Sequence, residues 1–247
     1  MSKKHPIIAV TGSSGANRRT VRETFEKLCI REKLLAAYVQ GDGFHRYDRA
    51  QMTQKIAEAA ENGDPHISHF SPKANLFDKQ EALYQYYGET GCGRRRFYLH
   101  NWQDTEPFKD LGLGPGEFSP WEDLPDSTDM LVYEGLHGWI SADGVNLAPY
   151  VDLKIGVVPV VDTSDPIIAR DIPTPDESLV VIRFKDPAQF NVDFPYLLQM
   201  LDGSWMSRRN SIVVTGGKMG LAMELIMTPI LQDIMEERRQ LLKREAA

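Results

Sequence analysis

Four stretches of the chain hold residue types that can bind an anion, accept a proton or hold a metal ion. They lie at residues 12–20 (GSSGANRRT), 41–46 (GDGFHR), 91–100 (GCGRRRFYLH) and 131–138 (LVYEGLHG). Glycine-rich backbone can enclose a phosphate group, a carboxylate can accept a proton, and arginines can neutralise phosphate oxygens. These groups indicate chemistry on an anionic, phosphate-bearing substrate.

The stretch at 12–20 follows the apolar run PIIAVT and opens a helical pattern. This is the context of a phosphate loop, in which backbone N–H groups surround an anion at a helix N-terminus. The alternative is an ordinary Gly/Ser turn between a strand and a helix. On the phosphate-loop interpretation, the nucleotide-binding residues are Gly12, Ser13, Ser14, Gly15, Ala16, Asn17, Arg18 and Thr20.

This loop departs from the G-x-x-x-x-G-K-[ST] pattern at three positions. Asn17 stands where glycine is expected, Arg18 where lysine is usual, and Arg19 where a hydroxyl that binds Mg²⁺ should be. Asparagine tolerates left-handed backbone, and Arg18 keeps the positive charge. A guanidinium group has no lone pair for a metal ion, so Arg19 cannot replace the hydroxyl. Thr20 could replace it if the loop shifts by one residue.

Two acidic residues follow apolar runs that are expected to be strands. Asp42 comes just after the run at 36–39, where a carboxylate can accept the proton of an attacking hydroxyl. Taken alone, GDGFHR is more typical of a turn with a helix-capping Asp. Glu134 follows the run at 130–133, the place of a carboxylate that holds Mg²⁺. The three arginines at 94–96 indicate an anion site or, equally, a solvated basic loop.

Short apolar runs alternate with helical patterns, which is typical of an α/β fold. We expect a mostly parallel sheet with helices on both faces, in one domain over residues 1–247. Strands are expected at 6–11, 36–39, 130–133, 151–160, 178–184 and 211–214. Helices are expected at 19–31, 52–61, 76–87 and 219–244, the last with a possible interruption at Pro229. In such sheets, ligands bind at the C-terminal ends of the strands.

Composition restricts the classes of partner. The formal net charge is -7 and the pI about 5.4, which argues against a nucleic-acid binder. Cys29 and Cys92 match no metal-site spacing and indicate free thiols in a reducing compartment. No apolar run reaches the length of a membrane span, and no signal peptide is evident. We expect a cytoplasmic protein without a membrane partner.

The chain resembles the bacterial type of phosphoribulokinase, within the uridine kinase-like superfamily, over nearly its whole length. The resemblance rests on GDGFHRYDRA, SHFSPKAN, YGETGCGRRRFYLH, YEGLHG, DLKIGVVPV, VDTSDPIIARDIPTPDES, DFPYLLQMLDGSWMSR and NSIVV, in this order. It implies the P-loop nucleotide-kinase fold. It also implies transfer of the γ-phosphoryl group of Mg-ATP to the 1-hydroxyl of ribulose 5-phosphate, a step of Calvin-cycle carbon fixation.

By this resemblance, Asp42 matches the catalytic base and Glu134 the acid that holds Mg²⁺. The sugar-phosphate site is matched by His45, Arg49, Tyr98 and His100. Enzymes of this type are homo-oligomers activated by NADH. Their allosteric arginines are matched by Arg31, Arg183 and Arg208.

One departure from this family is larger than the altered loop. Members continue for several tens of residues between IGVVPV and VPVVDTS, whereas here Val160 is followed at once by Val161. We therefore predict an internal deletion at the 160–161 junction. The resemblance implies that the missing stretch carries a second catalytic Asp and cations that contact the phosphates.

Three functions remain open from the sequence. The first is an active phosphoribulokinase. The second is an impaired or inactive relative that binds nucleotide or NADH, or that partners an intact kinase subunit, as Arg19 and the missing stretch favour. The third, a kinase more like uridine kinase, is disfavoured by GDGFHR and SWMSR.

Overall fold

The computed structural model describes residues 4–12, 18–63, 67–69, 71–142, 144–159, 178–184, 205–208, 211–215 and 219–246. The phosphate-loop residues Ser13 to Asn17 and the predicted junction at 160–161 lie outside these ranges. The statements that follow concern the described residues.

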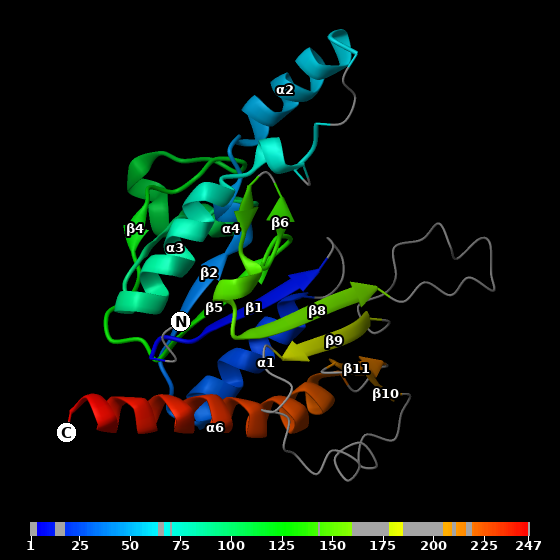
Figure 1. The fold of residues 1–247 in the computed structure, drawn as a ribbon. Helices are drawn as coiled ribbons and strands as arrows, with labels where there is room; N and C mark the ends of the chain where they lie inside the picture. The colour runs from blue at the N-terminus through cyan, green and yellow to red at the C-terminus, as the bar shows by residue number, and fades with distance from the viewer. Residues whose placement is uncertain are drawn as a thin grey trace.

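A seven-stranded sheet forms the centre of the molecule, in the order β10-β11-β9-β8-β1-β5-β2 (Figure 1). Strands β8, β1, β5 and β2 are parallel, whereas β9, β11 and β10 continue the sheet in antiparallel pairs. The strand bounds are β1 Ile7–Gly12, β2 Ala36–Gln40, β5 Met130–Gly135, β8 Leu153–Pro159, β9 Ser178–Phe184, β10 Trp205–Arg208 and β11 Ser211–Thr215.

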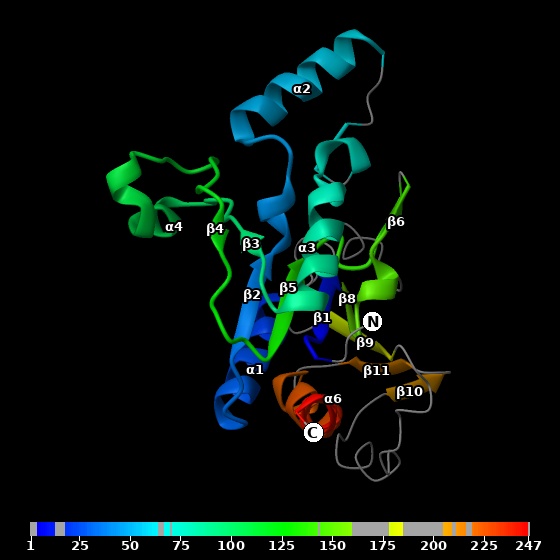
Figure 2. The same ribbon diagram turned by 60° about the vertical axis from the view of Figure 1, so that its left-hand side comes forward.

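Helices cover both faces of the parallel half of the sheet (Figures 1 and 2). Helices α1 (Arg18–Arg31) and α6 (Met219–Glu245) lie on one face and α3 (Phe77–Thr90) on the other. Strand β1 shows why two layers are needed. Ile8 and Val10 pack towards α1 and α6, while Ile7 and Ala9 pack with the aromatic side chains of α3. Alternate residues of a strand point to opposite faces, so a continuously apolar strand requires cover on both.

The remaining elements connect one strand of the main sheet to the next along the chain. Helix α2 (Arg49–Glu61) extends away from the sheet (Figure 1), and Asp48 caps its N-terminus in a capping box with Gln51. The others are η1 Gly41–Phe44, η2 Pro72–Ala74, β3 Arg94–Arg95, α4 Trp102–Thr105, η3 Glu106–Leu111, β4 Glu122–Asp123, β6 Ser141–Ala142, β7 Val145–Asn146 and η4 Ala148–Tyr150.

The α/β class expected from the sequence is confirmed, with the parallel strands at the centre and helices on both faces. The antiparallel strands β9, β11 and β10 extend this sheet, and β10 was not anticipated. Helix α6 continues through Pro229 without interruption. The single-domain assignment stays a prediction. No helix in the described part of the chain is both long enough and apolar enough to cross a membrane.

Candidate functional site

The C-terminal ends of β2 and β5 lie side by side and carry the two acidic residues singled out above. Gln40 of β2 pairs in parallel register with Glu134 of β5, so Asp42 lies two residues beyond the position opposite Glu134. Gly41 makes the close approach possible, because a Cβ atom there would lie 2.8 Å from Cα of Gly135. The two acids are therefore positioned at the ligand-binding edge typical of parallel sheets.

Two histidines hold the Asp42 carboxylate. Its Oδ1 lies 3.4 Å from Nε2 of His45, and its Oδ2 lies 3.1 Å from Nε2 of His100. The Asp42 side chain is about one quarter exposed, at 24%. Asp42 thus does not cap a helix. Asp48 caps α2, and the Asp42 carboxylate stays directed at two imidazole rings.

These contacts control the charge of the carboxylate. Burial by itself would raise the pKa of Asp42, but hydrogen bonds from His100 and His45 outweigh it and hold the pKa far below its ordinary value. The same hydrogen bond from His100 to Asp42 raises the pKa of His100 above its ordinary value of 6.5. Asp42 is therefore ionised throughout the physiological range of pH.

The predicted sugar-phosphate residues gather around Asp42. The ring of Tyr98 lies edge-on to both histidines, with centroid separations of 6.2 Å to His45 and 4.8 Å to His100. Arg49, at the first turn of α2, donates from Nη2 to the backbone carbonyl of His100 at 3.1 Å. The structure thus brings Asp42, His45, Arg49, Tyr98 and His100 into one cluster, although they come from segments far apart in sequence.

The three consecutive arginines at 94–96 separate into different structural contacts. Arg94 pairs with Asp123 at 3.2 Å, and Arg95 pairs with Glu122 at 2.9 Å. Arg96 turns towards the site and donates to the backbone carbonyls of Gly43 at 2.7 Å and His45 at 2.6 Å. These contacts hold the antiparallel pair of strands β3 and β4 and the turn that carries Asp42.

Glu134 supplies the carboxylate that could hold a magnesium ion. Its Oε2 lies 3.7 Å from Nη1 of Arg22, which comes from the second turn of α1. Next to it, Thr11 of β1 donates to the carbonyl of Gly135 at 2.8 Å. The end of β5 is thereby fixed beside the strand that leads into the glycine-rich loop.

A carboxylate oxygen is a suitable ligand for Mg²⁺, which in kinases is held by one or two carboxylates together with substrate phosphates and water. Among the described residues, no group of three or more His, Cys, Asp or Glu side chains is arranged to hold a metal ion. The donor set at Glu134 therefore fits a magnesium ion that arrives with a nucleotide, rather than a metal bound by protein ligands alone.

The glycine-rich loop itself is described only at its two ends. Gly12 is the last residue of β1, and α1 begins at Arg18 and contains Thr20. Ser13, Ser14, Gly15, Ala16 and Asn17 lie outside the described residues, so their nucleotide-binding role stays a prediction. The strand before this stretch and the helix after it confirm the flanking elements that the sequence indicates.

The three predicted allosteric arginines lie on the sheet and on α1. Ser211 of β11 pairs with Arg183 of β9 on one side and with Arg208 of β10 on the other. Arg31 is the last residue of α1 and donates from Nη2 to Oγ1 of Thr228 in α6 at 2.6 Å. The register places Arg183 and Arg208 in one row across the sheet, and an allosteric role for the three arginines stays a prediction.

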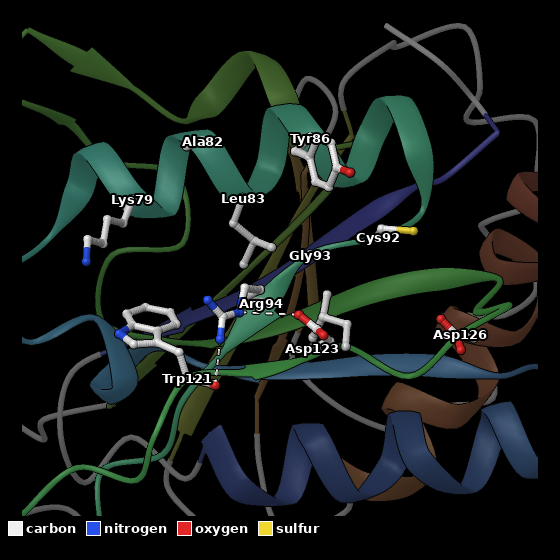
Figure 3. Close-up of a pocket in the computed structure, with 11 residues that line it drawn as sticks. Lys79, Ala82, Leu83, Tyr86, Cys92, Gly93, Arg94, Trp121, Asp123 and Asp126 are labelled. Carbon is white, nitrogen blue, oxygen red and sulfur yellow. Dashed lines mark hydrogen bonds and ion pairs between the residues drawn. The ribbon is translucent and has the colours of Figure 1, made fainter.

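A separate hollow of about 690 Å³ lies between α3 and the β3–β4 hairpin. Figure 3 shows Lys79, Leu83 and Tyr86 of α3 along one wall, with Trp121 and the Arg94–Asp123 ion pair opposite. The Nζ atom of Lys79 lies 5.2 Å from the ring centre of Trp121. Arg94 of the arginine stretch lines this hollow, whereas none of the residues predicted to bind nucleotide, sugar phosphate, Mg²⁺ or NADH does.

Sequence reasoning did not identify Asn75, and it considered Arg96 only as part of an anion site or a solvated loop, not as a support of the site. Asn75 accepts a hydrogen bond from the ring of His45, and Arg96 fixes the backbone of the η1 turn. Their segments, SHFSPKAN and GRRRF, were noted for resemblance and for charge. Their contacts depend on tertiary packing over 30 and 51 residues of sequence separation.

Comparison with known proteins gives a consistent family. The profile of the phosphoribulokinase / uridine kinase family matches residues 7–174. A phosphoribulokinase of Nitrobacter vulgaris is 44% identical, with 97% of this chain and 100% of that protein covered. One from Xanthobacter flavus is 45% identical, with 97% and 99% covered. The solved phosphoribulokinase from Rhodobacter spheroides superposes with a TM-score of 0.78 at 38% identity, covering 96% of this chain and 100% of that one.

The length of the alignment with the Nitrobacter protein is relevant to the predicted deletion. The match to the Nitrobacter protein extends over 294 aligned positions, whereas this chain has 247 residues, so at least 47 of those positions lack a residue of this chain. This shortfall has the size expected for the missing stretch and supports an internal deletion. Its place at the 160–161 junction stays a prediction, because those residues lie outside the described ranges.

Proposed function

The chain belongs to the phosphoribulokinase / uridine kinase family, and from this membership we propose that it transfers the γ-phosphoryl group of ATP to the 1-hydroxyl of ribulose 5-phosphate. The product is ribulose 1,5-bisphosphate. The observation that carries the proposal is the Asp42 carboxylate, held ionised between His45 and His100 beside the end of β5. A kinase that acts on a hydroxyl needs a carboxylate at this position to orient the nucleophile and receive its proton.

A carboxylate with a low pKa is a weak base, and this property limits how Asp42 can act. In a loose phosphoryl-transfer transition state, little proton transfer is needed before the bond to phosphorus is well advanced. The attacking hydroxyl becomes strongly acidic only as that bond forms. Asp42 therefore orients the hydroxyl first and accepts its proton late, while the two imidazole rings keep the carboxylate in place.

The neighbouring residues form a site for the phosphate end of the sugar. Arg49 is a permanent cation, and His100 is more readily protonated than a free histidine because Asp42 raises its pKa. Tyr98 is buried beside both histidine rings and restricts their movement. In this structure the Arg49 guanidinium binds the carbonyl of His100, which is a bond that a substrate phosphate could replace.

Nucleotide binding is proposed for the loop that joins β1 to α1, and magnesium binding for Glu134. Bound Mg²⁺ would supply positive charge that stabilises the charge developing on the phosphates. Glu134 is suited to hold it because this carboxylate lies at the end of β5, next to the strand that enters the loop. Arg22 lies 3.7 Å from Glu134 and supplies a positive charge beside this carboxylate.

A second candidate function is a relative that binds nucleotide or NADH with little or no turnover. The shortfall of at least 47 aligned positions and the presence of Arg19 in place of a hydroxyl favour it. Loss of phosphate-contacting cations would raise the barrier to transfer, because cations supply most of the stabilisation of the transition state. Such a protein could still bind substrates or pair with an intact kinase subunit.

A coupled assay for ADP release separates the two candidates. We would measure ATP- and Mg²⁺-dependent phosphorylation of ribulose 5-phosphate beside Asp42→Ala, with uridine as a competing acceptor. Turnover with ribulose 5-phosphate that disappears in Asp42→Ala supports the kinase. A folded protein that binds ATP without turnover contradicts it and supports the second candidate.

NADH control and self-association are further parts of the proposal. Arg183 and Arg208 flank Ser211 on neighbouring strands, which suits the two charges of a pyrophosphate group. Fluorescence titration of NADH against wild type and Arg183→Ala tests this binding, and unchanged affinity would contradict it. Light scattering after size exclusion tests the homo-oligomer, and a monomer at all concentrations would exclude it.

A further inference from the structure

Asn75 is a buried residue whose side chain is fully engaged in hydrogen bonds. It is only 3% exposed and lies at the C-terminal end of η2. Its Nδ2 donates to the backbone carbonyls of His69 at 2.9 Å and Ser71 at 2.8 Å. Its Oδ1 lies 2.9 Å from Nδ1 of His45, which is itself 6% exposed. The backbones of the two residues also form an isolated antiparallel bridge.

These contacts fix the orientation of the Asn75 carboxamide. A flipped amide would direct Oδ1 at two carbonyl oxygens, which cannot donate a hydrogen bond, so the NH₂ group must face His69 and Ser71. The atom facing His45 is therefore an acceptor. It follows that Nδ1 of His45 carries a proton and donates it to Asn75.

The opposite ring nitrogen of His45 faces the catalytic carboxylate. With Nδ1 protonated, neutral His45 has a lone pair at Nε2, which lies 3.4 Å from Oδ1 of Asp42. A nitrogen lone pair and a carboxylate oxygen at this distance repel each other, because neither supplies a proton. The arrangement is relieved when Nε2 gains a proton and donates it to Asp42. The charge of His45 is thereby linked to that of Asp42.

The other groups that surround the His45 ring do not replace Asn75 as the partner of Nδ1 or Asp42 as the partner of Nε2. The ring of His69 lies 4.7 Å away, and burial together with the charge of His45 lowers the pKa of His69, so that it stays neutral. Arg96 binds the backbone carbonyl of His45 rather than its ring, and Arg46 binds the backbone carbonyl of Asn75 at 3.1 Å. Tyr98 contacts the ring edge-on.

We propose that Asn75 is a positioning residue that holds His45 in the Nδ1-protonated form and makes Nε2, the nitrogen facing Asp42, the atom that gains and loses a proton. Its role in turnover rests on the proposed function. Through His45, Asn75 makes the nitrogen that faces Asp42 on one side an acceptor when His45 is neutral and a donor when His45 is protonated. His100 supplies the donor on the other side.

The direct test is ¹⁵N NMR of the imidazole nitrogens, which distinguishes protonated from unprotonated ring nitrogens. The chain has 6 histidines, and a His45→Gln spectrum identifies the His45 signals by their loss. In wild type with His45 neutral, we expect a protonated Nδ1 and an unprotonated Nε2. Asn75→Leu, of similar volume, should move the proton largely to Nε2. A wild-type ring protonated at Nε2, or an unchanged ring in Asn75→Leu, overturns the proposal.

A second variant keeps an acceptor for Nδ1 but loses the NH₂ group. Asn75→Asp retains an oxygen towards His45, while its second oxygen faces the carbonyls of His69 and Ser71, so circular dichroism first checks that the variant folds. In the folded variant the proton of neutral His45 should stay on Nδ1. Gln80→Met is the matched control, because Gln80 is also a buried amide, at 1% exposure, without contact to His45. Gln80→Met should leave the His45 signals in place. Displacement of those signals in the control would overturn the assignment to Asn75.

Kinetics connect this contact to the proposed reaction. We expect kcat to fall in Asn75→Leu, because His45 is then no longer held in the Nδ1-protonated form. Asn75→Asp, where it is folded, should recover part of the loss because it restores an acceptor for Nδ1. Equal losses of kcat in Asn75→Leu and Asn75→Asp, without a change of the His45 tautomer, would mean a structural role alone. Expected NMR changes in a chain without turnover would contradict the kinase proposal and leave the assignment of Asn75 intact.

Discussion

The guanidinium group of Arg96 lies 3.7 Å from the ring centre of Phe118, and its Nη2 donates to the backbone carbonyl of His45 at 2.6 Å. The same side chain donates from Nε to the carbonyl of Gly43. Burial lowers the pKa of Arg96 to about 10, a value at which the group remains charged near neutral pH. One side chain thus joins the ring of Phe118 to two backbone carbonyls that follow Asp42.

Replacing Arg96 with lysine should destabilise the protein by about 2 kcal/mol, because two charge-assisted hydrogen bonds and the stacking on Phe118 are lost together. Urea unfolding followed by circular dichroism measures the change. Arg94→Lys is the matched control, since the ion pair of Arg94 with Asp123 is exposed and should be worth less than about 1 kcal/mol. Equal effects of the two substitutions would contradict the anchoring role of Arg96.

The bond between His100 and Asp42 predicts a dependence of stability on pH. The pKa of His100 is raised in the folded state, so its contribution is fully present below the ordinary value of 6.5 and is lost as the pH rises through the folded value. The free energy of unfolding of wild type should therefore exceed that of His100→Gln by more at about pH 6 than at about pH 9. Thermal or urea unfolding across this range measures the difference.

His69→Gln is the matched control for that experiment. Burial and the charge of His45 lower the pKa of His69, so its protonation opposes folding. The difference between wild type and His69→Gln should change with pH in the opposite direction, and become more favourable to wild type as the pH rises. The same slope for both histidines would show that the contact with Asp42 is not the cause.

Gly41→Ala should destabilise the protein by about 1–3 kcal/mol and reduce turnover, because an added Cβ would lie 2.8 Å from Cα of Gly135 and force β2 and β5 apart. Gly88→Ala is the control, since Gly88 lies within α3 with no atom within 4 Å of an added Cβ. There alanine should stabilise the helix by about 0.5–1 kcal/mol. Chemical denaturation of both variants checks these opposite signs, and a tolerated Gly41→Ala would refute the close approach.

Glu134→Gln should weaken binding of Mg-ATP by about tenfold or more, equivalent to about 1.4 kcal/mol, because an amide is a poorer ligand for Mg²⁺ than a carboxylate. Binding of ATP in the presence of a chelator should change much less. Isothermal titration calorimetry measures both. Glu26→Gln is the control, because Glu26 also pairs with Arg22, at 3.3 Å, but from α1 rather than from the sheet edge. Equal losses of Mg-ATP affinity in the two variants would show that the effect comes from a lost partner of Arg22 and not from a lost ligand of the metal ion.

The sequence determined the elements and the candidate residues because local patterns specify both. Continuous apolar runs predicted β1 and β5, and the position of Asp42 and Glu134 after such runs placed them at one edge of the sheet. Resemblance added His45, Arg49, Tyr98 and His100, and the structure brings these around Asp42.

Tertiary structure alone decided how those residues act on one another. Three contacts join residues that are far apart along the chain: His100 with Asp42, Asn75 with His45, and Arg96 with the carbonyl of His45. The contact of His45 with Asp42 depends on the turn between them. No periodicity encodes which carbonyl a buried amide or guanidinium will meet, since that depends on packing of the whole layer. The antiparallel extension through β9, β11 and β10 has the same origin, because strand order is set by long-range pairing rather than by the local pattern that makes each strand.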